Sequence, residues 1–354
     1  MAFTTINKSS EYFNTKLFTG DGATSNAITG VGFQPDFVWL KNRSAVAGHQ
    51  LSDAVRGKSG TNYYSLSSDT TAAQAVQGDN DGLNTLGSDG FTVGYTNSTG
   101  WNNSGNNYAS WNWKANGTGS SNTVGSINST VSANTTSGFS VVTFTGTGAN
   151  ATVGHGLGSV PKMIILKSYG GSTNWIVYHN SIGNGKALSL NTTAAESADA
   201  GYFNSTTPTS TVFSLGSDGF SNGSGQTMVA YCFADVQGFS KMGSYKGNGS
   251  ADGTFVYTGF KPAFVMTKEW EGTSDWYMND TTRDFNGTYG NDASLLANTS
   301  GAEFTSASLN VDMLSNGFKL RSTNASTNEV AGYIYMVFAA APLVGSNNVP
   351  ANAR

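Results

Sequence analysis

Charged residues, cysteine and histidine are all scarce in this sequence. Charged residues make up 11% of the 354 positions, against about 25% in an average globular protein. A single cysteine, Cys232, excludes an internal disulfide framework. The three histidines, His49, His155 and His179, include no pair at a spacing typical of a metal site. We therefore expect a fold stabilised by packing alone, with no cofactor and no bound metal.

The scarcity of charged residues also limits the kinds of molecule that we expect the protein to bind. The formal net charge is −4 and the lysines and arginines do not cluster, so nucleic acid is not an expected partner. The longest apolar run, near Tyr333 to Val344, falls short of the ~20 residues that span a bilayer. Residues 1–8 lack the apolar core of a secretory signal. We expect a soluble protein with no membrane insertion.

Apolar residues, in contrast, are plentiful enough to build packed cores. They make up 38% of the chain, with 12% aromatic residues, and this argues against disorder. The chain is longer than one core usually serves, so two or three domains are expected. Gly, Asn, Ser and Thr take the place of the missing charges, and they suit turns and the solvated faces of strands.

One stretch occurs three times along the chain. It reads GFQPDFVWLK at residues 32–41, GSVPKMIILK at 158–167 and GFKPAFVMTK at 259–268. The second and third residues after the proline are large and apolar each time, and the sixth is always lysine (Lys41, Lys167 and Lys268). The run is too short for a helix but fits a strand buried on both faces, with proline at its entry. We expect it to be the central strand of three similar units.

The register of the repeat extends beyond this strand. The fourteenth residue after the proline is His49, Trp175 or Trp276, each at the head of a second predicted strand. Four residues later, Asp53 and Arg56 have the same spacing as Asp280 and Arg283, whereas the second unit has His179 at this place. We interpret each Asp-x-x-Arg as an ion pair that pins a turn, worth ~1 kcal/mol when exposed, rather than as a catalytic pair.

Two further signatures complete each unit. Ser-Asp-Gly-Phe or Ser-Asn-Gly-Phe occurs within 87–91, 216–220 and 314–318, and predicts a tight turn that opens a strand. Half of a calcium loop is the alternative, but no second acidic residue recurs at a fixed spacing. An aromatic strand then closes each unit, at 108–113, 228–233 and 333–338. Cys232 falls inside one of these strands, as a small buried residue would.

These signals predict an all-β fold of three tandem β-sandwich units with a jelly-roll-like character. Many short strands and units of ~100 residues favour sandwiches, whereas the blades of the alternative, a β-propeller, are shorter. We expect units at 1–117, 137–238 and 239–354, with 118–136 as a linker or a pair of exposed strands. The second and third units have almost no linker between them, so we expect them to pack as a pair with the first more independent.

The sequence contains few motifs that indicate a catalytic or binding activity. It contains no Gly-x-Ser-x-Gly elbow, no His-Glu-x-x-His helix and no phosphate-binding loop. Two loop carboxylates could serve a glycosidase, which is the enzymatic alternative, but we expect no catalytic residues. Aromatic residues beside Asn and Gly suit sugars, and the candidates are Tyr95, Trp101, Asn102 and Trp270. The structural alternative is that these tryptophans cover the ends of sandwiches or fill interfaces.

The triple Gly-Phe-x-Pro-x-Phe-Val pattern, the Ser-Asp/Asn-Gly-Phe turns, the opening residues 1–19 and the ending 347–354 resemble a family of marine bacteriophage proteins. Its members occur in cyanophages and uncultured marine phages and are treated as virion structural or tail-associated proteins. The resemblance covers essentially the whole chain and implies a place on the virion, but it brings no catalytic or binding residues. We expect a non-enzymatic virion surface protein, a tail or fibre component or a head decoration, assembled in the host cytoplasm.

A second hypothesis is a carbohydrate-binding adhesin of a tail fibre that recognises a glycan of the host surface. The expected partners are other virion proteins and identical copies of this chain. No heptad run is present, so we expect oligomer contacts through loops and strand edges rather than a coiled coil, with a trimer favoured.

Overall fold

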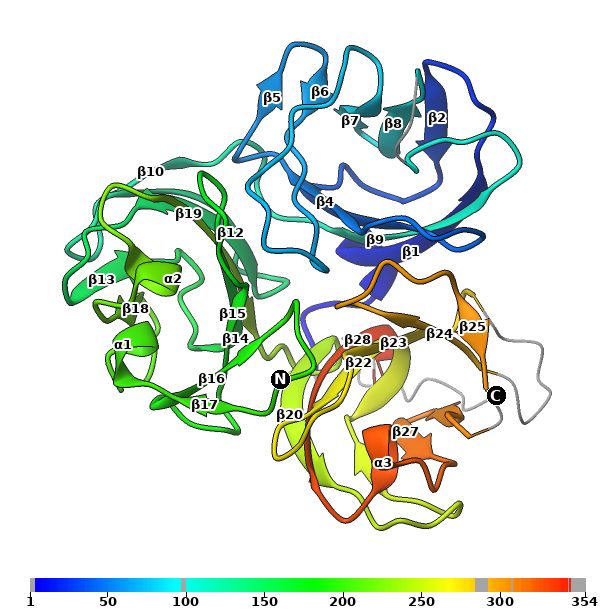
Figure 1. Cartoon of the computed structure of the whole chain (residues 1–354). Coiled ribbons are helices and arrows are strands. Elements are labelled where there is room, and N and C mark those ends of the chain that lie inside the picture. The colour runs from blue at the N-terminus through cyan, green and yellow to red at the C-terminus, as the bar shows by residue number, and fades with distance from the viewer. Residues whose placement is uncertain (1–3, 97–99, 284–291, 307, 343, 345–354) are drawn as a thin grey trace.

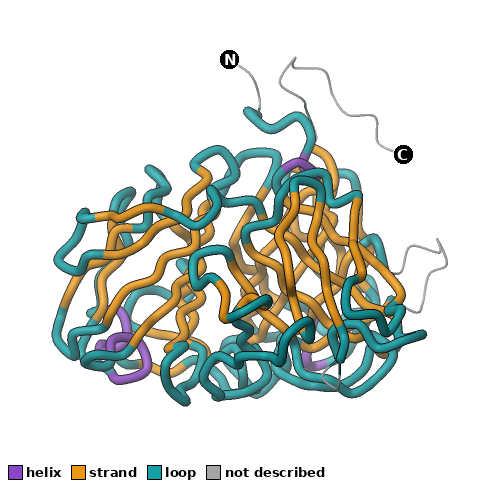
Figure 2. The backbone as a smooth tube through the Cα atoms, turned by 90° about the horizontal axis from the view of Figure 1, so that it is seen from above, coloured by secondary structure: helices purple, strands orange, loops and turns teal. Residues whose placement is uncertain are grey.

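The computed structural model describes residues 4–96, 100–283, 292–306, 308–342 and 344, and they form an almost entirely β structure. The predicted all-β class is confirmed. Figure 1 shows three lobes around a common centre. We call them unit 1 (residues 4–117), unit 2 (118–238) and unit 3 (239–344). Each unit has a larger sheet toward the centre and a smaller sheet outside it. Figure 2 shows strands running through the whole body with only short helical segments.

The larger sheets share one antiparallel pattern. In unit 1 the order is β1 (Phe13–Thr19), β9 (Asn107–Trp113), β3 (Phe37–Asn42), β4 (Gln50–Asp53). In unit 2 it is β10 (Ser120–Asn122), β11 (Ser129–Asn134), β12 (Phe139–Thr145), β19 (Thr227–Ala234), β14 (Pro161–Ser168), β15 (Ile176–His179), β16 (Lys186–Ser189), β17 (Ser197–Ala198). In unit 3 it is β20 (Ser240–Lys246), β28 (Gly332–Pro342), β22 (Phe260–Glu269), β23 (Tyr277–Asp280), β24 (Ala293–Leu296), β25 (Phe304–Thr305).

The smaller sheets lie on the outer side of the larger ones. They pair β2 (Asn26–Thr29), β8 (Gly90–Gly94) and β7 (Gly82–Gly87) in unit 1, β13 (Ala151–Gly154) and β18 (Val212–Leu215) in unit 2, and β21 (Phe255–Tyr257), β27 (Gly317–Leu320) and β26 (Val311–Leu314) in unit 3. The remaining elements are the hairpin β5 (Lys58–Ser59) and β6 (Asn62–Tyr63), the 3-10 turn η1 (Ser9–Glu11), and the short helices α1 (Ala200–Phe203), α2 (Gly219–Asn222) and α3 (Ala325–Asn328).

The repeated stretch occupies the same place in all three large sheets. Strands β3, β14 and β22 each lie between the closing aromatic strand and the strand that follows the repeat. The fourth residue after the proline faces equivalent partners: Trp39 lies opposite Trp111 and Leu51, Ile165 opposite Tyr231 and Val177, and Met266 opposite Met336 and Met278. Buried on both sides, these strands are continuous apolar runs, as expected for interior strands.

A single core at the centre joins the inner faces of the three large sheets. Phe37 of unit 1 stacks on Tyr231 of unit 2 with ring centroids 4.3 Å apart. Phe13 of unit 1 stacks on Phe338 of unit 3 at 4.7 Å, and Phe233 of unit 2 meets the same ring at 6.1 Å. The expectation that units 2 and 3 pair while unit 1 stands apart is therefore wrong, because all three units bury aromatic side chains together.

Each unit also has an outer core, between its larger and smaller sheets. Alternate residues of a strand point to opposite faces, so in unit 1 Trp39 belongs to the central core while Val38 and Leu40 contact the small sheet. Ile28 and Phe91 face them from β2 and β8. Each unit is thus two-layered, and its larger sheet is also one wall of the shared core.

The Ser-Asp-Gly-Phe turn behaves as predicted in two of its three copies. Asp89-Gly90 and Asn316-Gly317 join the two strands of a hairpin, and the following phenylalanines are buried. The strand prediction is wrong in unit 2, where Asp218 caps α2 by accepting a hydrogen bond from the Phe220 N–H at 2.7 Å. There Phe220 is 40% exposed, and Phe213 of β18 fills the equivalent outer-core place instead.

Of the two alternatives for the segment 118–136, the structure contains the pair of strands and not the linker. Its strands β10 and β11 extend the large sheet of unit 2, with β11 paired along its whole length to β12. Among the residues that the structure describes, no helix has the length and apolar character needed to cross a membrane. The predicted loose tail, 345–354, lies outside the described residues.

Candidate functional site

Buried polar side chains lie at the junctions between units, at positions that are equivalent in the three repeats. The three lysines that follow the repeated prolines are fully buried. Lys41 donates to the Ser300 carbonyl of unit 3 at 3.2 Å, Lys167 to the Thr71 carbonyl of unit 1 at 3.0 Å, and Lys268 to the Thr193 carbonyl of unit 2 at 3.1 Å. Burial lowers the pKa of all three to about 8. Each unit therefore reaches back to the one before it in the ring.

A second contact follows the same direction around the ring. The His49 Nε2 lies 3.0 Å from the Leu296 carbonyl, the Trp175 indole N–H donates to the Ser67 carbonyl at 2.9 Å, and that of Trp276 to the Ser189 carbonyl at 3.1 Å. His49 Nδ1 accepts a hydrogen bond from the Trp39 indole at 2.8 Å, which fixes a neutral ring with its proton on Nε2. Burial lowers the His49 pKa to about 4.

A third contact joins the last residue of β4, β15 or β23 to the following unit of the ring, the opposite direction from the first two contacts. Tyr231 of unit 2 donates to Asp53 of unit 1 at 2.8 Å, and the Trp111 indole of unit 1 donates to Asp280 of unit 3 at 3.0 Å. The corresponding residue of unit 2, His179, has its Nε2 3.3 Å from the Tyr335 carbonyl of unit 3. Burial lowers the His179 pKa to about 4. The position that ends β4, β15 and β23 therefore always binds the closing strand of a neighbour.

The two Asp-x-x-Arg pairs are buried parts of these junctions. Arg56 Nε donates to Asp53 at 2.6 Å, and Arg283 Nε to Asp280 at 2.6 Å, with all four side chains inaccessible to solvent. The predicted ion pairs are therefore present, but they are buried and not exposed. Breaking a buried pair of this kind costs several times more than breaking an exposed one.

The three asparagines Asn102, Asn222 and Asn328, each fully or almost fully buried, clamp the loop that leads into the small sheet. In unit 2 the Asn222 amide donates to the Ala149 and Gly216 carbonyls at 2.7 and 2.8 Å, and its oxygen accepts from the Thr147 N–H at 2.9 Å. Asn102 and Asn328 make the same kind of contacts in units 1 and 3. All of these amides are used to hold loops together.

The remaining candidates for nucleophile or base are also engaged in the fold. His155 is buried, with its Nε2 3.1 Å from the Thr209 carbonyl. Cys232 is buried in β19, and burial raises the pKa of its thiol to about 12. A thiol held this far above neutral pH carries almost no reactive thiolate.

The turn aspartate considered for calcium binds backbone instead. Asp89 accepts hydrogen bonds from the Gly30 and Gly32 N–H groups at 3.0 and 2.8 Å. These two bonds lower the pKa of the carboxyl group. Within the described part of the chain, no group of three His, Cys, Asp or Glu side chains is placed to hold a metal ion.

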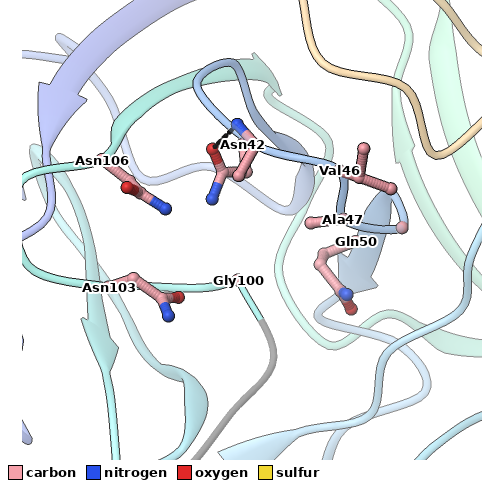
Figure 3. Close-up of a pocket in the computed structure, with 9 residues that line it drawn as sticks. Asn42, Val46, Ala47, Gln50, Gly100, Asn103 and Asn106 are labelled. Atoms are coloured by element: carbon pink, nitrogen blue, oxygen red, sulfur yellow. Dashed lines mark hydrogen bonds between the residues drawn. The ribbon is translucent and has the colours of Figure 1, made fainter.

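A shallow hollow of about 330 Å³ lies on unit 1, between the loop after β3 and the loop before β9. Figure 3 shows the amide side chains of Asn42, Asn103 and Asn106 on one side of it and Val46 and Gln50 on the other. The Asn42 oxygen accepts from the Ser44 and Ala45 N–H groups, which shapes the rim. Amide groups can both donate and accept, so the hollow suits a neutral polar ligand.

The four residues predicted for sugar binding do not form one site. Trp101 is completely buried in the outer core of unit 1 and Asn102 is a loop clamp, so neither presents a surface to a ligand. Tyr95 is half-buried, and its N–H donates to the Ala23 carbonyl. Trp270 packs beside Gly332 of β28, and its carbonyl accepts from the Glu196 N–H of unit 2, so it is a junction residue.

A comparison with protein families finds a match for this chain. A model for a domain of unknown function, DUF7483, covers residues 8–342. The chain belongs to the DUF7483 family. Because the DUF7483 match begins before β1 and ends with β28, it spans all three units together with their junctions. No curated protein matches the sequence.

Sequence reasoning missed the loop clamps of this DUF7483 chain, although a signal for them exists. Asn102 and Asn222 each precede the equivalent residue of the closing strand, Trp111 or Tyr231, by nine positions, and Asn328 precedes Met336 by eight. In a sequence so rich in asparagine this recurrence is hard to see until the strands are in register. The hollow of unit 1 has no comparable signal, since its amides come from two separate loops.

Proposed function

We propose that this DUF7483 protein is a non-enzymatic structural protein of a bacteriophage virion surface, in a tail or fibre assembly or as a head decoration. The observation that supports a structural role best is the closed set of junction contacts described above. Fully satisfied buried polar networks add rigidity and specify one arrangement. A ring locked by nine such contacts suits a particle component that must keep its shape outside the cell. The resemblance of the repeats to marine phage proteins supports the place on the virion.

The use of the reactive side chains supports the absence of catalysis in this proposal. All three histidines have backbone partners, and the thiol of Cys232 has a raised pKa. The enzymatic alternative is tested by incubating the purified protein with host polysaccharide and assaying new reducing ends. Release of fragments that a loop-carboxylate substitution abolishes would overturn the non-enzymatic part of the proposal.

Purified virions of the phage that encodes the protein test its location. Mass spectrometry of the particles is expected to detect the chain in stoichiometric amounts, and a cryo-EM map is expected to show its three-lobed density on the head or tail surface. A protein abundant in the infected cell but missing from purified particles would contradict a virion role.

We further propose that copies associate with one another and with other virion proteins, with a homotrimer favoured. Junction residues inside one chain already close a ring of three units, so each copy has three similar outer faces. Closed symmetry is the usual result for identical chains. Light scattering on the isolated protein is expected to give a multiple of the chain mass, and a monomer in solution that is also solitary in the particle map would contradict it.

Host glycan recognition is the second candidate function, and the amide-lined hollow of unit 1 favours it. The side-chain amides of Asn103 and Asn106 on one side of the hollow and of Gln50 on the other carry N–H groups that can donate to sugar hydroxyl groups. Substituting Asn103→Ala and Asn106→Ala is expected to weaken attachment of the protein to host cells. Because the Tyr108 hydroxyl donates to the Asn103 oxygen at 3.2 Å, attachment is measured at a temperature at which the double variant is fully folded. Unchanged attachment by the double variant would remove the hollow from consideration.

A further inference from the structure

Two exposed aromatic side chains stand next to each other on the small sheet of unit 3. Phe255 and Tyr257 alternate with the buried Val256 in β21, so both rings lie on the outer face of the sheet. Phe255 is 43% and Tyr257 is 54% exposed. Across the sheet, Tyr257 lies opposite Gly317, which has no side chain to cover the rings. We call these two rings and their surroundings the outer platform; its sheet is the one that contains β27 in Figure 1.

The internal repeat shows that the fold does not need these aromatics. Val256 corresponds to Ile28 in unit 1 and Val153 in unit 2, because each faces the buried phenylalanine of the neighbouring strand. The residues on either side are therefore equivalent as well. They are Ala27 and Thr29 in unit 1 and Thr152 and Gly154 in unit 2. Two units of the ring form the same sheet with small side chains, so only unit 3 carries the aromatic pair.

Two lysines beside the rings show the same asymmetry. Lys241 donates to the Tyr257 carbonyl at 3.0 Å, and its Nζ lies 5.7 Å from the centre of the Tyr257 ring. Lys319 lies opposite Phe255 in the sheet. Their counterparts in register are Asn14 and Thr92 in unit 1 and Ser140 and Ser214 in unit 2. Four neighbouring positions thus change together from small uncharged residues to aromatics and lysines.

The charges around the outer platform balance one another. Asp252, which is 76% exposed, pairs with Lys319 and with Arg321 at 2.6 Å each. Arg321 also pairs with Asp312 at 2.6 Å, and Lys241 interacts electrostatically with Asp235. A patch with equal numbers of the two signs does not favour a nucleic acid or an anionic membrane. Its polar rim instead supplies donors and acceptors for hydroxyl groups.

The size of the apolar area decides between a protein partner and a small ligand. A complete aromatic side chain buries about 150–250 Å², and here about half of each ring is already covered. A stable protein interface needs about 800 Å² on each side, several times more than the two rings can offer. One face of a pyranose ring carries C–H groups and its edge carries hydroxyl groups, which matches a flat aromatic surface with a polar rim.

We propose that the outer platform of unit 3 is a binding site for a neutral hexopyranose of a surface polysaccharide, stacked on Tyr257 and Phe255. This site is separate from the hollow of unit 1, and it does not require that the protein be part of a virion. Lys241 and Asp252 are placed to hydrogen-bond the sugar at the rim.

Affinity electrophoresis of the full chain in gels that contain dextran, mannan, galactan or β-glucan tests the site, followed by calorimetry with an oligosaccharide of the retarding polymer. Because aromatic residues at a binding centre carry much of the binding energy, Tyr257→Ala is expected to raise the Kd by about tenfold or more, which corresponds to about 1.4 kcal/mol or more. Phe255→Ala is expected to act in the same direction. Added salt is expected to leave the affinity unchanged, since the ligand is neutral.

Two control variants separate this site from general effects. Val330→Ala removes another exposed apolar side chain, 70% exposed, from the same unit, and is expected to bind sugar as the parent does. Asn103→Ala changes unit 1 alone, where it alters the hollow and removes a hydrogen bond from Tyr108. It is expected to bind the polysaccharide as the parent does, and a loss of binding equal to that of Tyr257→Ala would place the sugar in the hollow instead.

Several results would overturn the proposal. The first is that none of the four polymers retards the parent protein, and the second is that the aromatic variants bind as the parent does. The third is that salt abolishes binding. The fourth is that the aromatic variants change the oligomeric state of the protein and not its affinity for sugar. Detection of the chain in virions is independent of all these results, so the virion proposal and the sugar proposal can fail separately.

Discussion

The Tyr231 hydroxyl of unit 2 donates a 2.8 Å hydrogen bond to the Asp53 carboxylate of unit 1, and the same oxygen of Asp53 binds Arg56. Burial holds the pKa of Tyr231 well above its usual value, so the phenol is a protonated donor at neutral pH. We expect Tyr231→Phe to lower the free energy of unfolding by about 1.5–3 kcal/mol, as for other hydrogen bonds to charged groups. Urea denaturation measures the change.

The control for this prediction is Tyr257→Phe, which removes a hydroxyl group from a half-exposed side chain. It is expected to change the stability by less than about 0.5 kcal/mol. Equal effects of the two variants would show that the Tyr231 contact does not stabilise the junction.

Replacing a buried lysine is expected to weaken the junction between units 1 and 2. Lys167 donates to the Thr71, Gly171 and Thr173 carbonyls, and Lys167→Met would remove these three bonds. Since hydrogen bonds to a charged group contribute about 1.5–3 kcal/mol, the midpoint of urea unfolding should fall clearly. Lys162→Met, at a half-buried position of the same strand, should leave it nearly unchanged. A midpoint for Lys167→Met at or above that of the control would contradict the prediction.

The loop clamps are expected to matter in each unit. Asn222→Ala removes one acceptor and two strong donors from a buried loop, so we expect a loss of about 2 kcal/mol or more. The matched control is Asn184→Ala, because Asn184 makes its bond to Thr207 at the surface. Hydrogen exchange should show the loss of protection in the loop near Ala149. Protection that is unchanged there would exclude a clamping role.

Acid is expected to destabilise the ring through its junction histidines. His49 and His179 have pKa values of about 4 in the folded protein, against about 6.5 in an unfolded chain. Between these values the unfolded state binds more protons, so the free energy of unfolding falls as the pH drops from 6.5 toward 4. Each pKa unit of difference is worth about 1.4 kcal/mol.

Denaturation at pH 7 and pH 4.5 checks this for the parent and for His179→Gln. The variant is expected to start less stable and to lose less on acidification, because one of the two junction histidines is gone. A variant that loses as much stability as the parent would show that His179 does not contribute to the acid sensitivity.

Sequence reasoning captured what depends on local register. The proline, the lysine six positions later and the strand that follows are fixed within one short segment, and pairing with the closing strand preserves the register. The role of the repeated residues in joining the units could not be predicted from the local register. The lysines and the residues at the ends of β4, β15 and β23 contact other units, and such long-range neighbours leave no trace in a local pattern.

The failed predictions have a common physical origin. Trp101 was a candidate for sugar binding because asparagine and glycine surround it, with a structural role as the alternative, and the loop turns its indole into the outer core. Asp218-Gly219-Phe220 repeats a turn motif, but in unit 2 the adjacent strand places Phe213 in the apolar site first. In both cases tertiary packing overrode a local preference. Only the comparison of the three units shows which residue occupies the apolar site.

The stacking of Phe13 on Phe338 has a consequence for how the chain is made. Phe13 lies in the first strand and Phe338 in β28, which is synthesised after every element that it contacts. Until β28 is added between β20 and β22, the aromatic faces of the first two units remain without their third wall. Nascent chains that expose such surfaces are prone to aggregate, so we expect the risk of aggregation to last from the synthesis of the first strand to the synthesis of the last.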